Sequence, residues 1–250
     1  MNPTITLAVA GRVLLQLRHD HRTLAMLLVL PCLILSLLWW IFIDAGPAFD
    51  SLGPPLLALI PFIVMFLVTS VTTLRERSSG TLERLLSMPT GKLDLLVGYA
   101  LAFGLMAAVQ SALAVGVSVW LLDLTVTGPV WMLGLVAIAD AVLGTALGLF
   151  VSAFARTEFQ AVQFMPVIVI PQILLCGLFI PRDQMPRALE LVSDVLPLSY
   201  AVDAMTSVTT SVSDAFGGVD ADVWTDLGIV AAFAVAALAL GAATLRRRTA

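Results

Sequence analysis

The chain has 250 residues, of which 60% are hydrophobic and 12% are charged, and its formal net charge is −4. Globular domains carry roughly 25% charged residues, so this composition excludes an ordinary soluble domain and indicates a protein embedded in a membrane. No nucleic-acid-binding signature is present. The two cysteines, Cys32 and Cys176, lie within apolar runs, where neither is placed for a disulfide or a metal site.

Six apolar runs are long enough to cross a bilayer, whose core needs about 20 helical residues. We therefore expect an all-α integral membrane protein with six transmembrane helices in a single domain, residues 1–250. The first run exceeds the roughly 7–15-residue apolar core of a signal peptide, so we expect no cleavage. The predicted spans are residues 24–43, 56–74, 95–122, 130–154, 159–180 and 227–245.

The basic residues predict the orientation. With both termini in the cytoplasm, eleven of the thirteen basic residues fall on the cytoplasmic side. This asymmetry is typical of membrane proteins and favours six spans with both ends inside. The cytoplasmic set is Arg12, Arg18, Arg22, Arg75, Arg77, Arg84, Lys92, Arg156, Arg246, Arg247 and Arg248, and the outer pair is Arg182 and Arg187.

Residues 1–23 precede the first span, and their pattern predicts an amphipathic helix in the cytoplasmic headgroup layer, with Arg12 and Arg18 reaching anionic lipid. A plain cytosolic extension of the first span is the alternative. The predicted apolar face holds Leu7, Ala10, Val13, Leu14 and Leu17, while Arg12, Gln16 and His19 lie on another face. His19 and His21 have no further ligand nearby, so we interpret them as interfacial polar residues rather than metal ligands.

A charged segment, residues 75–89, separates the second and third spans. Its second half places Leu82, Leu85 and Leu86 at helical spacing with charges elsewhere, which predicts a short amphipathic helix that Pro89 ends. A compact segment tethered by two spans is suited to docking on a soluble partner. A solvated loop with incidental charge is the alternative.

Polar residues within the spans are candidates for lining a pathway. Along the fourth span Asp140, Gly144 and Gly148 recur every four residues, which predicts close approach of a neighbouring helix. An ionisable residue at this depth is a functional candidate by default, the alternative being a neutral or hydrogen-bonded structural role. Gln110 on the third span is a possible partner of Asp140. In the fifth span, Gln163 and Gln172 accompany Pro166 and Pro171, whose bends are found both in pathways and in plain packing.

The outer segment, residues 181–223, is too short and too charged to span. Pro186 can begin one helix with an apolar face that includes Leu189 and Val192, and residues 200–208 predict a second. We expect both to lie at, or dip into, the outer leaflet. Trp224 then anchors the last span and basic C-terminus, residues 224–250.

This order of parts resembles the permease subunit of ABC-2 type exporters, in particular the drug-export branch related to the daunorubicin-resistance permeases. The stronger local match is Glu76-Arg77-x-x-Gly80-Thr81-Leu82-Glu83-x-Leu85. The weaker one is Leu178-Phe179-x-Pro181, Met185-Pro186 and Leu196-Pro197-x-x-Tyr200-x-x-Asp203. Many relatives carry an arginine shortly after that aspartate, whereas Met205 and Thr206 stand there in this chain.

The resemblance implies that this chain forms one half of a transport pore and is not itself a catalyst. Two copies of a separate ABC ATPase would hold ATP and Mg, and would dock on the coupling segment. A second permease, identical or related, would complete the pathway in a bacterial plasma membrane, with the outer segment as a lid. The coupling residues implied are Arg75, Glu76, Arg77, Gly80, Thr81, Leu82, Glu83, Arg84 and Leu85, and the candidate pathway-lining residues are Gln110, Asp140, Gln163 and Gln172.

The sequence itself agrees with a non-catalytic role, because it has no G-x-x-x-x-G-K-[ST] phosphate loop. We expect an amphipathic drug or a lipid as substrate, and a lipid-linked polysaccharide or another envelope glycoconjugate is the alternative. An intramembrane enzyme would need catalytic groups at membrane depth, yet no H-E-x-x-H, G-x-S-x-G or carboxylate cluster lies in the spans. A stand-alone secondary transporter would show related halves, and no convincing repeat is present.

Overall fold

A computed structural model describes residues 2–44, 48–79, 91–210 and 221–244. Every regular element within these ranges is helical. The elements are α1 (Pro3–His19), α2 (His21–Ile41), α3 (Ala48–Ser78), α5 (Lys92–Trp120), α6 (Val130–Ser152), α7 (Glu158–Leu175), the 3-10 helix η1 (Arg182–Gln184), α8 (Arg187–Ser193), α9 (Pro197–Thr210) and α10 (Ala221–Thr244).

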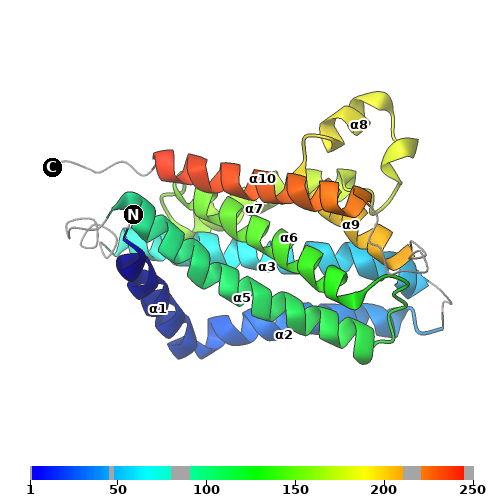
Figure 1. The fold of residues 1–250 in the computed structure, drawn as a ribbon, viewed down its shortest axis with the longest axis horizontal. Coiled ribbons are helices and arrows are strands. Elements are labelled where there is room, and N and C mark those ends of the chain that lie inside the picture. The colour runs from blue at the N-terminus through cyan, green and yellow to red at the C-terminus, as the bar shows by residue number, and fades with distance from the viewer. Residues whose placement is uncertain (1, 45–47, 80–90, 211–220, 245–250) are drawn as a thin grey trace.

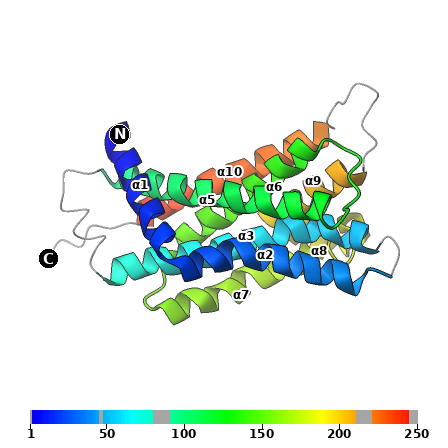
Figure 2. The same ribbon diagram turned by 90° about the horizontal axis from the view of Figure 1, so that it is seen from below.

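Six of these helices, α2, α3, α5, α6, α7 and α10, are long and apolar enough to cross a membrane, which confirms the predicted number of spans. They run along one another in an elongated bundle (Figure 1). Helix α1 crosses one end of this bundle at a steep angle, and α8 and α9 lie toward the other end (Figure 2). We call the end that holds α1 and the last turns of α3 the basic end, because Arg12, Arg75 and Arg77 belong to it.

The centre of the bundle is the contact between α3 and α6. A Cβ atom at Gly144 would lie 2.4 Å from the carbonyl oxygen of Phe62, and one at Gly148 would lie 2.6 Å from that of Phe66. Both distances are far below van der Waals contact, so only glycine allows this approach of the two backbones. The close helix contact expected from the four-residue spacing is therefore confirmed, and its partner is α3.

Helix α3 begins eight residues before the predicted span, at Ala48, so Gly53, Pro54 and Pro55 are helical although they lie outside the predicted span. Proline fixes φ near the helical value, but Pro54 and Pro55 lie in the second turn of α3, where each leaves a carbonyl of the first turn without its helical donor. Asp50 in that turn accepts hydrogen bonds from the amide and the hydroxyl of Thr125, at 2.9 and 3.0 Å. Packing against the α5–α6 loop thus stabilises a helical start that hydropathy alone does not indicate.

The predicted fifth span is too long at its end, because α7 stops at Leu175 instead of residue 180. Gly177 has φ = +92°, a left-handed conformation that ends a helix and that side chains disfavour. The last span differs in the other direction, since α10 begins at Ala221, six residues before the predicted start. The other span ends agree with the prediction to within four residues.

Helix α1 is rotated relative to its predicted apolar face. The buried residues are Thr6, Val9, Ala10, Val13 and Leu17, whereas Leu7 is 65% exposed. The rotation brings one face of α1 onto α5. The chain turns from α1 into α2 at Asp20, whose carboxylate accepts hydrogen bonds from the hydroxyl and the amide of Thr23, at 2.7 and 3.2 Å. These bonds lower the pKa of Asp20, as expected for a charged helix cap.

The outer segment forms the two predicted short helices, and α9 is an integral part of the core. Its buried residues include Leu198, Val202 and Met205, which pack among α3, α6 and α10. The end of α9 is held by the α5–α6 loop, because the amides of Thr127 and Gly128 donate to the carbonyls of Thr209 and Val208, at 3.3 and 3.0 Å. Helix α8 instead exposes most of its apolar side chains.

Candidate functional site

At the basic end, Glu76 lies between three helices. It comes from the last turns of α3 and is only 7% exposed. Its carboxylate accepts a hydrogen bond from the hydroxyl of Tyr99 on α5 and an ion-paired one from Arg12 on α1, at 2.7 Å. Arg12 also donates to the Tyr99 hydroxyl, at 2.9 Å. We call these three residues the basic-end clasp, because they join α1 to the two helices on either side of the charged segment.

A second set of contacts ties α1 to the start of α5. Asp94 accepts hydrogen bonds from the amide of Asn2 and the hydroxyl of Thr6, at 2.9 and 3.4 Å. One turn later, Gly98 leaves no room for a Cβ atom, which would lie 2.7 Å from the Val9 side chain and 2.9 Å from the Thr6 carbonyl oxygen. Helix α1 is therefore fixed on α5 along its first half and on α3 through Arg12.

The two arginines that flank Glu76 bind the turn between α6 and α7. The guanidinium of Arg75 makes two bonds to the carboxylate of Glu158, at 3.0 and 3.2 Å, in the bidentate arrangement that fixes orientation. Arg77 donates to the carbonyl oxygen of Ser152, in the last turn of α6. An arginine at a helix C-terminus satisfies a carbonyl that lacks a helical donor and complements the helix dipole. We call the contacts of Arg75, Arg77, Ser152 and Glu158 the α6–α7 joint.

The predicted coupling residues thus divide into two groups. Arg75, Glu76 and Arg77 continue α3 and bind other helices of the same chain. The rest of the predicted set lies outside the described residues and stays a prediction. That second group consists of Gly80, Thr81, Leu82, Glu83, Arg84 and Leu85.

Asp140 and Gln110 are buried inside the bundle, with exposures of 0% and 1%. Within the described ranges, no hydrogen bond reaches either oxygen of Asp140 or the amide atoms of Gln110, so the structure does not pair them. Asp140 lies one turn before Gly144, on the stripe that packs against α3. It faces neighbouring helices and not lipid, as predicted.

We expect Asp140→Asn to fold normally and to support normal transport, because asparagine matches the shape of aspartate and no ion pair would be lost. Apparent thermal stability in detergent should change by less than about 1 kcal/mol, as is usual for a substitution that removes no partner. Export by a reconstituted complex provides the functional measurement. A well-folded Asp140→Asn protein that no longer exports would contradict this structural role.

The two glutamines of α7 occupy different environments. Gln163 is exposed at the surface of the chain, in the second turn of a candidate span. Gln172 is 3% exposed, and its amide donates to the carbonyl of Ile168 at 3.1 Å while its carbonyl accepts from the amide of Leu198 at 3.4 Å. Leu198 is the second residue of α9, where backbone amides lack helical acceptors. Gln172 therefore caps α9.

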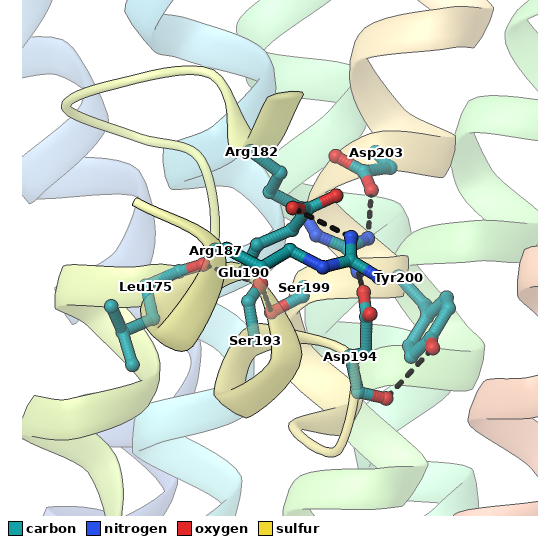
Figure 3. Close-up of polar contacts among 9 residues, drawn as sticks. All are labelled: Leu175, Arg182, Arg187, Glu190, Ser193, Asp194, Ser199, Tyr200 and Asp203. Carbon is teal, nitrogen blue, oxygen red and sulfur yellow. Dashed lines mark hydrogen bonds and ion pairs between the residues drawn. The ribbon is translucent and has the colours of Figure 1, made fainter. Parts of the chain in front are cut away.

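Arg182 organises the outer segment, and Figure 3 shows its partners. Its guanidinium pairs with Asp203 on α9 and with Asp194, directly after α8, and lies 5.0 Å from the ring centre of Tyr200. The Tyr200 hydroxyl donates to the Asp194 carbonyl oxygen at 2.7 Å. Burial raises the pKa of Asp203, although the nearby Arg182 acts to lower it. Burial acts to lower the pKa of Arg182, but its hydrogen-bonded carboxylates raise that pKa overall. We call these four residues the Arg182 cluster.

Sequence reasoning identified Tyr200 and Asp203 as a motif but missed their partner. The arginine sought after Asp203 is absent, and the positive charge instead comes from a residue 21 positions earlier. One signal could have found it: Arg182 is one of only two basic residues assigned to the outer side, among several acids.

Comparison with known proteins now decides the family. A family model described as ABC-2 type transporter matches residues 4–209. The chain belongs to the ABC-2 type transporter family. It is similar to the probable multidrug ABC transporter permease YbhR of Escherichia coli (strain K12), with 27% identity over 150 residues, which is 60% of this chain and 41% of YbhR.

Two further relatives show the same extent of similarity. The linearmycin resistance permease protein LnrN of Bacillus subtilis (strain 168) is 25% identical over 188 residues, or 75% of this chain and 47% of LnrN. The ABC transporter G family member 20 of Dictyostelium discoideum is 25% identical over 159 residues, or 64% of this chain and 22% of that protein. The matched region therefore covers less than half the length of each of these three relatives.

Membership of the ABC-2 type transporter family confirms the resemblance drawn from the motifs. The chain is therefore an ABC-2 type permease, built of membrane-spanning helices. It is a multi-pass membrane protein, and its bacterial relatives agree with a location in the bacterial plasma membrane.

Proposed function

We propose that this permease forms half of the translocation pathway of an ATP-driven exporter, with residues 75–89 as its coupling segment. The observation that carries the proposal is that residues at both ends of this segment bind other helices of the chain. Glu76 at its start and Asp94 shortly after its end both bind α1, and Arg75 and Arg77, also at its start, hold the α6–α7 turn. A force applied to the segment would therefore reach α1, α3, α5, α6 and α7 together.

Residues 80–85 would contact the ATPase, and Arg75, Glu76 and Arg77 would transmit its movement within the permease. In this proposal two copies of the ATPase bind ATP and Mg, and this chain binds no cofactor. A second permease, identical or related, completes the pathway. The basic end faces the cytoplasm, in line with the usual distribution of Lys and Arg.

The exposed face of α7 supports a pathway between two permeases. An exposed amide such as Gln163 is costly in hydrocarbon, so we propose that this face meets the second permease or the substrate rather than lipid. Gln110, Asp140 and Gln172 lie inside one subunit, so they would line the pathway only if its helices separate. The names of YbhR and LnrN favour an amphipathic drug or lipid-like substrate over a lipid-linked glycoconjugate.

The test is purification of the chain from its native membranes, with Glu83→Lys as the critical variant. We expect the unaltered permease to retain an ABC ATPase, so that the purified complex turns over Mg-ATP. The variant should lose that subunit while its own folding is unchanged. Asp44→Lys makes the same charge change at the opposite end of the bundle and should retain the ATPase. Export with a normally assembled Glu83→Lys complex would contradict the docking role.

A further inference from the structure

Helix α7 is one of the two candidate spans that are buried least within the chain, the other being α2. In its most apolar stretch 17% of the residues are buried within the chain, compared with 61% in α3 and in α6. It also carries Pro166 and Pro171, which remove backbone hydrogen bonds and allow bending. Its main lateral contact is with α3, so its position relative to the other helices depends strongly on what holds its two ends.

The α6–α7 joint holds α7 at the basic end. Beneath the bidentate pair of Arg75 and Glu158, the side chains of Leu74, Ala155 and Ala161 form a small buried cluster of their own. Arg75 and Glu158 remain 61% and 47% exposed. An exposed pair of this kind contributes little to overall stability, and it fixes geometry while remaining easy to break and re-form.

The other end of α7 carries the outer segment, as Figure 3 shows. The hydroxyl of Ser193, at the end of α8, donates to the carbonyl oxygen of Leu175 at 2.8 Å and lies 3.0 Å from the hydroxyl of Ser199 on α9. Gln172 caps the first turn of α9 through the amide of Leu198. The Arg182 cluster then fastens η1 and α8 onto α9.

Helix α9 is therefore held at two points that belong to different parts of the bundle. Its first turn is attached to α7, while its last turn is attached to the α5–α6 loop through Thr127 and Gly128. A displacement of α7 along or across the bundle would tilt α9 about this second attachment. Since α9 packs against α3, α6 and α10, such a tilt changes the interior of the outer half.

We propose that Arg75 and Glu158 are positioning residues that fix α7 to the coupling end of α3, so that movement there is carried by α7 to α9 in the outer segment. The proposal rests on the proposed function, because it names the route by which a movement at the coupling segment reaches the opposite end. The movement would enter α7 through the ion pair of Arg75 and Glu158. It would pass from α7 to the outer segment through Gln172 and Ser193.

Cys176 provides a natural reporter for the test. It is fully buried directly after α7, in the same core cluster as Leu198 on α9. We would measure its rate of modification by a soluble maleimide in the full chain in lipid nanodiscs, with Cys32→Ala removing the other thiol. Arg75→Glu and Glu158→Arg should each raise this rate by about two- to fivefold, the range expected from breaking one exposed ion pair. The double charge reversal should restore the original rate.

Arg156→Glu is the matched control, because it reverses an exposed charge within the same α6–α7 turn without touching the pair. It should leave Cys176 reactivity unchanged. Single variants that react like the unaltered chain would overturn the proposal. A double variant as reactive as the single ones would also overturn it, since the pair itself would not then be responsible.

This experiment uses the permease without any ATPase, so the two proposals fail separately. Unchanged Cys176 reactivity removes the route through α7 but leaves ATPase docking on residues 80–85 intact. Failure to retain an ATPase, with the expected Cys176 response, removes the proposed function but leaves the attachment of α7 to α3 in place.

Discussion

Gly144→Ala is expected to destabilise the bundle by about 2–3 kcal/mol, or to prevent its folding. The added methyl group would lie 2.4 Å from the carbonyl oxygen of Phe62 and 3.1 Å from its carbonyl carbon. These are backbone atoms, so no side-chain rotation relieves the overlap, and α3 and α6 would have to separate. Overpacking in a well-packed core usually costs about 1–3 kcal/mol, and a contact between two backbones belongs at the upper end. Thermal unfolding of the purified chain in detergent measures the effect.

Gly134→Ala on the same helix is the matched control, because no atom lies within 4 Å of the position where its Cβ would be built. Alanine is favoured over glycine in a helix by up to about 1 kcal/mol, so this variant should be as stable as the original or more so. Equal losses at Gly134 and Gly144 would contradict the close backbone contact between α3 and α6.

The sequence predicts this contact for a simple reason. Glycines every four residues form one stripe on a helix, and such a stripe is useful only where another backbone approaches. Hydropathy likewise predicts the six spans, because crossing a bilayer demands long apolar helices with satisfied backbone groups. These features depend on local patterns, which a single sequence contains in full.

The ends of the helices depend on contacts that a local pattern does not contain. Helix α3 extends back through two prolines because Asp50 binds Thr125, and α7 ends early because Gly177 adopts a positive φ. Neither the distant partner nor the sign of φ can be read from hydropathy. Errors of a few residues at span ends therefore have identifiable physical causes.

The candidate site shows the same limit more strongly. The charges at positions 75–77 favour a surface for a soluble partner, since charged residues in a short loop usually face solvent. In the structure all three have partners within the chain, and those partners come from α1, α5 and the α6–α7 region. Pairing between charges separated by tens of residues is set by the tertiary arrangement, which the sequence alone did not provide.

Arg12→Met is the second substitution for which we expect a large effect. Methionine keeps the apolar stem on α5 but leaves the Glu76 carboxylate, 7% exposed, with Tyr99 as its remaining partner in the basic-end clasp. Removing one member of a fully buried ion pair costs about 3–5 kcal/mol, and because Arg12 itself is 29% exposed we expect about 2 kcal/mol. Helix α1 should also loosen, which limited proteolysis near Asp20 would detect together with a lower unfolding temperature.

Arg18→Met is the control for this prediction, because Arg18 lies on the same helix and is exposed. Its loss should change the unfolding temperature little, as is typical of surface charges. A double variant, Arg12→Met with Glu76→Gln, should lose less stability than the two single changes added together, because removing both charges leaves no unpaired one in the clasp. Additive losses would mean that Arg12 and Glu76 act separately, and would contradict the ion pair as the link between α1 and α3.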